Sequence, residues 1–166
     1  YRDGKYIEAL GMSFRDFMTG KLPALPGEVP TLSDWADHLT TAFPEARIKK
    51  YLEMRGADGG PWRRICALPA FWVGLTYDQS ALDAAWDLCK GWSAEEREAL
   101  RVDASVRGLA ARVPGGGTMR DLAARCLEIA EAGLRARARP GAGGLIPDET
   151  HFLNALKESV ERNETP

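Results

Sequence analysis

The spacing of apolar residues changes part-way along the chain, and this change limits the possible folds. From Ser80 onward apolar residues recur every three or four positions, which is the period of an amphipathic helix. Before that point, the side chains of segment 48–55 alternate between two faces, as in a β-strand, and a glycine-rich stretch follows at 56–60. The pattern predicts an α+β fold with a few strands in the first half and a mostly helical region after them.

Residues that can cap a helix N-terminus stand before most of the runs with helical periodicity. Strands are expected at 6–10 and 48–55, and an irregular loop rich in proline and glycine at 20–30. The helices expected are 14–19 after Ser13, 32–43 after Thr31 or Ser33, 61–77 with a disturbance at Pro69, 80–90, one opened by the capping box of Ser93 and Glu96, 119–139 after Thr118, and a last one after Asp148.

Size and charge exclude several classes of protein. The 166 residues include 22 Lys and Arg against 24 Asp and Glu, a formal net charge of −2. This balance argues against a nucleic acid or an anionic membrane as the main partner. No apolar run reaches the roughly 18 residues that a membrane-spanning helix needs. Without an initiator Met or a signal-peptide core, the chain is expected to be cut from a longer protein.

The cysteines and histidines give little sign of a metal site. Cys66, Cys89 and Cys126 are an odd, widely spaced set, which predicts neither a disulfide framework nor a zinc site. Cys89 and Cys126 fall among apolar positions and are expected to be small core residues. His38 and His151 are isolated. A chain with this cysteine usage is expected in the cytoplasm.

Glu53 and Arg55 are the main candidates for residues that take part in catalysis. Two positions apart on a strand, they project from one face, roughly 7 Å apart. A carboxylate there can bind Mg²⁺, and a guanidinium beside it can hold a phosphate and stabilise a transferring phosphoryl group. The same spacing also fits a plain surface ion pair, worth about 0–1 kcal/mol, and spacing alone leaves both interpretations open.

The pair lies within a longer motif, Tyr51-Leu52-Glu53-Met54-Arg55-Gly56-Ala57-Asp58-Gly59-Gly60-Pro61-Trp62-Arg63-Arg64. This run resembles the signature of the plant-type glutamate–cysteine ligases, a type shared with proteobacteria. The resemblance covers residues 1–78 closely and 80–166 more loosely. It implies a catalytic-sheet segment at 1–78, whose antiparallel strands belong to a larger sheet, and a helical region at 79–166. Both would be one compact fragment of a longer enzyme of the glutamine synthetase/guanido kinase-like superfamily.

The resemblance also implies a reaction. ATP would phosphorylate the γ-carboxylate of L-glutamate, and the amine of L-cysteine would attack the acyl phosphate, as the first step of glutathione synthesis. By the same resemblance, Glu53 binds Mg²⁺, or Mn²⁺ in its place, and Arg55 contacts the γ-phosphate or the acyl phosphate. Further residues expected to line the site are Tyr51, Asp58, Trp62 and Arg63. The other metal ligands and most of the glutamate pocket would come from the missing N-terminal part of the chain, so the fragment alone is expected to be inactive.

The chain departs from the plant members of the family at two sets of cysteine positions. Ala9 and Ala24 stand where plant members carry a regulatory disulfide, and Cys66 matches a cysteine whose plant partner lies upstream. Redox control of the plant kind is therefore not expected.

A related ligase that joins glutamate to another amine fits the same residues, and so does a helical interaction module without catalysis. The sequence leaves the oligomeric state open.

Overall fold

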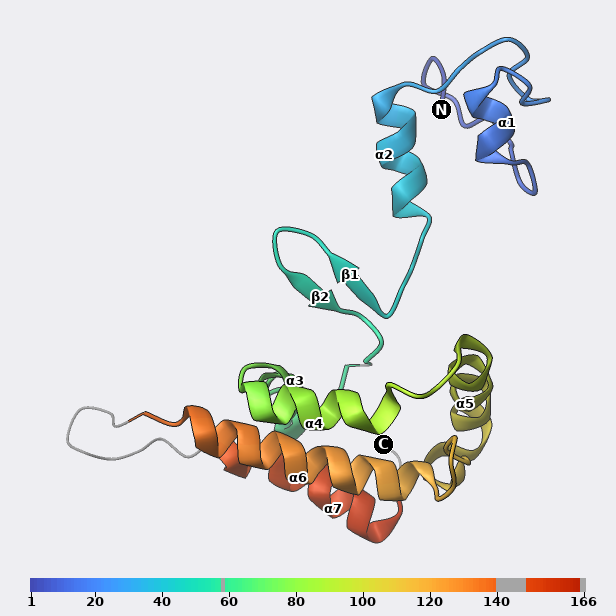
Figure 1. The fold of residues 1–166 in the computed structure, drawn as a ribbon. Helices are drawn as coiled ribbons and strands as arrows, with labels where there is room; N and C mark the ends of the chain where they lie inside the picture. Colours follow the sequence, from blue (N-terminus) through green and yellow to red (C-terminus); the bar gives the residue numbers. More distant parts are fainter. Residues whose placement is uncertain (58, 140–148, 165–166) are drawn as a thin grey trace. The chain divides into compact units, whose positions relative to one another are not determined.

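The computed structural model describes residues 1–57, 59–139 and 149–164. It groups the chain into two compact units, Tyr1–Ala57 and Asp58–Pro166 (Figure 1). The first unit holds two short helices and a two-stranded antiparallel sheet, and the second is helical. The predicted α+β class, with a mostly helical second part, is therefore confirmed. A functional division at residue 78 and a larger parent sheet stay predictions.

The helices of the first unit begin where their capping residues predict. The Ser13 hydroxyl caps α1 (Phe14–Met18) by accepting from the Arg15 N–H. Thr31 caps α2 (Leu32–Thr40) in a capping box, in which the Asp34 side chain accepts from the Thr31 N–H in return. This box decides for Thr31 over Ser33. The helix ends three residues before the predicted Phe43, where the Thr41 hydroxyl bonds to the carbonyl oxygen of His38.

The strand predicted over 48–55 is confirmed for Leu52–Met54 and is wrong as one continuous strand, because the chain reverses direction within it. Strand β1 (Ala46–Ile48) pairs antiparallel with β2 (Leu52–Met54), and the connection at 49–51 is closed by the Lys49 N–H donating to the Tyr51 carbonyl at 2.8 Å. Side-chain alternation continues on both sides of a short turn, so alternation alone does not separate one strand from a hairpin. The predicted strand at 6–10 is also wrong, since no described segment pairs with it.

The second unit contains five α-helices among its described residues (Figure 1). In chain order its elements are η1 (Trp62–Arg64), α3 (Ala67–Thr76), α4 (Gln79–Cys89), α5 (Ala94–Arg107), η2 (Gly108–Ala110), α6 (Met119–Arg137), η3 (Glu149–Leu153) and α7 (Asn154–Arg162). The capping box predicted at Ser93 opens α5. Thr118 opens α6 as predicted, and the structure shows that it does so in a capping box with Asp121. Asp148, the predicted cap of the last helix, lies outside the described residues.

The predicted helix from Pro61 to 77 is wrong in its first part. A short 3₁₀ turn at Trp62–Arg64 comes first, and α3 begins only at Ala67. Pro69 then stands in the first turn of α3, where a backbone N–H would have no partner within the helix. Proline therefore suits the beginning of this helix and does not disturb it.

The core of the second unit forms where α3 and α4 pack against α6. Its buried apolar residues are Ala70, Leu75, Ala81, Leu127, Ile129, Ala130, Leu134 and Leu153. The three cysteines are free; Cys66 is exposed, and Cys89 and Cys126 are partly buried. Burial raises the pKa of the Cys126 thiol. No helix in the described part of the chain is long and apolar enough to cross a membrane.

Candidate active-site hairpin

The β1–β2 hairpin holds Glu53 in an ion pair that the sequence did not predict. Arg47 on β1 lies directly opposite Glu53 on β2 in the strand register. Its Nε and Nη2 atoms are each 2.9 Å from Oε2 of Glu53. Residues directly opposite on one face of an antiparallel pair are close neighbours, so the backbone pairing places these two side chains together.

Arg55 faces the same carboxylate, as its two-residue spacing from Glu53 predicts. Its Nη1 lies 3.6 Å from Oε2 of Glu53, and its guanidinium lies over the ring of Phe43, 5.1 Å from the ring centroid. The backbone N–H of Arg55 donates to the carbonyl oxygen of Glu45, which extends the hairpin pairing beyond Met54. Lys49 completes the group, with Nζ 3.7 Å from Oε1 of Glu53.

These cations hold Glu53 in its ionised form. Burial of the carboxyl opposes ionisation, but the hydrogen bond from Arg47 and the charges of Arg47, Lys49 and Arg55 together lower the pKa of Glu53. The side chains of Glu53 and Arg47 are 26% and 27% exposed, so a ligand can still reach them. The arrangement can bind an anion through the guanidinium groups and offer one carboxylate to a cation.

A complete metal site is not present in the described part of the chain. No group of three or more His, Cys, Asp or Glu side chains is gathered there in a way that could hold a metal ion. Glu53 fits as one oxygen ligand, because its Oε1 lies 3.7 Å from Nζ of Lys49, which is beyond hydrogen-bonding distance. The remaining ligands of a bound Mg²⁺ would have to come from other residues.

The other predicted site residues are divided between the two units. Tyr51 lies in the hairpin turn and is exposed. Trp62, also exposed, and Arg63 belong to the second unit, where Arg63 forms an ion pair with Glu158 of α7 at 2.8 Å. Asp58 lies outside the described residues. Their place beside Glu53 therefore stays a prediction.

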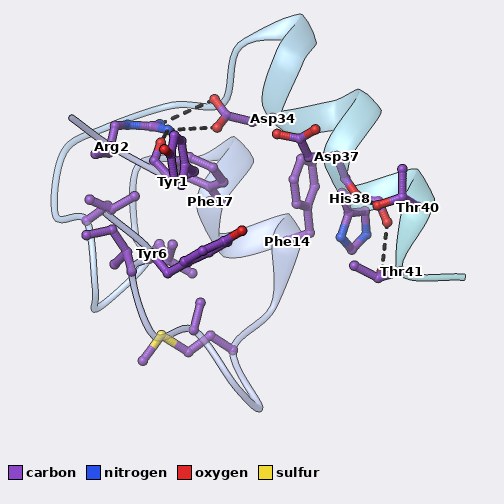
Figure 2. Close-up of a pocket in the computed structure, with 15 residues that line it drawn as sticks. Tyr1, Arg2, Tyr6, Phe14, Phe17, Asp34, Asp37, His38, Thr40 and Thr41 are labelled. Atoms are coloured by element: carbon purple, nitrogen blue, oxygen red, sulfur yellow. Dashed lines mark hydrogen bonds and ion pairs between the residues drawn. The ribbon is translucent and has the colours of Figure 1, made fainter. Parts of the chain in front are cut away.

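A separate pocket of about 640 Å³ lies in the first unit, against α1 and α2 (Figure 2). Aromatic and aliphatic side chains form much of its wall, with Phe14 stacked on the His38 ring. Figure 2 shows the Arg2 guanidinium directed at the Asp34 carboxylate, 2.7 Å away, which holds the pKa of Asp34 far below its usual value. This pocket contains none of the predicted site residues.

Comparison with known proteins assigns the chain to a family. The model of Glutamate-cysteine ligase family 2 (GCS2) matches residues 4–165, nearly the whole chain. The chain belongs to this family. It is 52% identical to the chloroplastic glutamate–cysteine ligase of Medicago truncatula and 57% identical to ligase A of Oryza sativa subsp. indica. Each match covers 100% of this chain but only 31% and 36% of those relatives, respectively. The chain thus spans about a third of the length of these ligases.

The comparison confirms the resemblance and corrects one expectation. The family predicted from the motif at 51–64 is the family found. The predicted cytoplasmic location is contradicted, because the ligases of Medicago, rice and Arabidopsis thaliana are all chloroplastic by name. That prediction rested on the cysteine usage, which argues only against a disulfide-rich secreted protein and does not specify one compartment inside the cell.

Proposed function

We propose that this chain is part of an enzyme that joins the γ-carboxylate of L-glutamate to the amine of L-cysteine with hydrolysis of ATP, the first step of glutathione biosynthesis. The observation that carries the proposal is the Glu53–Arg55 pair on the hairpin, within the motif of a glutamate–cysteine ligase family. A ligase of this type needs a cationic group at the transferring phosphoryl group, and Arg55 is available for that role.

The reaction proceeds in two transfers. The γ-carboxylate of glutamate attacks the γ-phosphorus of ATP, and ADP leaves with an acyl phosphate formed. The amine of cysteine then attacks the acyl carbon, inorganic phosphate leaves, and the amine loses a proton as the amide forms. Arg55, supported by the ring of Phe43, would stabilise the negative charge on the phosphoryl oxygens in both steps.

Glu53 would contribute one oxygen ligand to Mg²⁺, or to Mn²⁺ in its place, with the other ligands outside the described residues. When bound, the metal neutralises phosphate charge. Tyr51, Asp58, Trp62 and Arg63 would line the substrate or nucleotide site. Arg63 forms an ion pair with Glu158. To line the site, Arg63 would either keep this ion pair or give it up to contact the ligand.

The test follows ADP release by a full-length ligase that carries this segment, with glutamate and Mg²⁺, with and without cysteine. Glu53→Gln and Arg55→Ala should each lower kcat/KM at least tenfold, about 1.4 kcal/mol of barrier. Arg101→Gln removes an exposed arginine paired with Glu98 on α5 and serves as the matched control. Silent Glu53 and Arg55 variants would show that the pair is only a surface ion pair. Activity with another amine but not with cysteine would indicate the related ligase. If the wild-type protein is active with no amine, the chain would belong to a non-catalytic module.

A further inference from the structure

Two guanidinium groups share one oxygen of Glu53. Arg47 binds Oε2 with Nε and Nη2, each at 2.9 Å, and Nη1 of Arg55 lies 3.6 Å from the same atom. Lys49 faces the other oxygen at 3.7 Å. Three positive charges and one negative charge leave a formal net charge of +2. No other acidic side chain of the described residues forms an ion pair with these cations.

The backbone, and not a chance side-chain conformation, holds Arg47 in this group. Arg47 and Glu53 are direct partners in the β1–β2 register, so both must project from the same face of the hairpin. About three-quarters of each side chain is shielded from solvent, which reduces the screening of their charges. Arg55 is held independently by the ring of Phe43. The two guanidiniums are therefore presented together before any ligand arrives.

Arg47 keeps donors that Glu53 does not use. A guanidinium has five N–H donors in a planar fork, and only those on Nε and Nη2 of Arg47 are engaged with the carboxylate. Such a fork matches two oxygens of a phosphate. Two arginines and a lysine gathered around one carboxylate suit a ligand with several phosphate groups better than one with a single carboxylate.

We propose that Arg47, together with Arg55, contacts the phosphate groups of the bound nucleotide, and that Glu53 spaces the two guanidiniums for this purpose. Lys49 adds a third, more exposed positive charge. The proposal rests on the proposed ligase function and deepens it, since it assigns a second arginine to the nucleotide. The ligand class is a nucleoside di- or triphosphate.

The test measures ADP binding by calorimetry to a full-length ligase that carries this segment, without glutamate or cysteine. Arg47→Gln should raise the Kd for ADP about tenfold, the cost of one lost charge-assisted contact. Lys49→Gln should raise it less, and both variants should weaken the salt dependence of binding. Arg125→Gln removes an exposed arginine that pairs with Glu128 on α6, and it should leave the Kd unchanged. Inorganic tripolyphosphate should compete with ADP for the wild-type protein.

The outcomes separate this proposal from its alternatives. A higher KM for ATP with an unchanged KM for glutamate in Arg47→Gln supports a phosphate contact. An unchanged Kd for ADP, with faster hydrogen exchange of the hairpin amides, would show that Arg47 only stabilises the hairpin, and would overturn the proposal. If the wild-type protein forms no γ-glutamyl product while Arg47→Gln still weakens ADP binding, the ligase function fails but the nucleotide contact stands.

Discussion

A Cβ atom added to Gly133 would lie 1.9 Å from the carbonyl oxygen of Gly74. A Cβ on Gly74 would in turn lie 2.3 Å from the carbonyl oxygen of Ala130. Helices α3 and α6 therefore touch backbone to backbone, and α4 packs beside this contact through Ala81, 2.9 Å from the added Cβ on Gly133. Only residues without a side chain permit helices to approach so closely.

Gly133→Ala should destabilise the second unit by about 3 kcal/mol, because rigid backbone cannot move aside as a side chain can. Hydrogen–deuterium exchange of the α3 and α6 peptides in a full-length ligase would measure the loss. Gly91→Ala is the matched control, since its added Cβ has nothing within 4 Å. Equal protection of α6 in both variants would contradict the close contact.

Thr118→Ala should weaken the beginning of α6. The Thr118 hydroxyl accepts from the Asp121 N–H, and the Asp121 carboxylate accepts from the Thr118 N–H. Loss of such a cap costs about 1 kcal/mol. Exchange of the first-turn amides should accelerate in Thr118→Ala and stay slow in Thr118→Ser, which keeps the hydroxyl. Acceleration along the whole helix would indicate global unfolding and not a local cap.

The ion pair of Arg2 with Asp34 should make the first unit sensitive to acid. Hydrogen bonds from Arg2 and Thr31 lower the pKa of Asp34 far below the value of about 3.9 expected in the unfolded chain. A lowered folded-state pKa gives stability that is fully present above the unfolded value and is lost as pH falls below it. Exchange protection of the α2 amides, corrected for intrinsic rates, should fall from about pH 4 downward. Asp34→Asn should flatten this dependence, and parallel pH profiles for both proteins would contradict it.

Phe43→Leu should lower the activity of a full-length ligase modestly. The Phe43 ring lies under the Arg55 guanidinium, a cation–π contact worth about 0.5–1 kcal/mol at an exposed site. We expect kcat/KM to fall about two- to fivefold. Phe43→Tyr keeps an aromatic face and should retain activity. The same loss in Phe43→Tyr would show that the ring does not act through its face toward Arg55.

Half of the candidate site could be predicted from the sequence. Glu53 and Arg55 are two residues apart in extended backbone, so their shared face follows from local geometry. Arg47 could not be found in this way. On a continuous strand it would lie about 20 Å from Glu53, and only the reversal at 49–51 brings the two side chains together. The turn residues Lys49, Lys50 and Tyr51 include neither glycine nor proline, so no strong turn signal was present.

The beginnings of several helices and the family of the chain could be predicted from the order of the residues alone. Caps at Ser13, Thr31, Ser93 and Thr118 act within three residues, so local sequence suffices to place them. The pairing of the strand residues and the contact between the glycines become visible only in the folded chain. The ion pair of Arg47 with Glu53 and the contact of Gly74 with Gly133 depend on backbone segments that approach through space, and the register and the helix crossing set those distances.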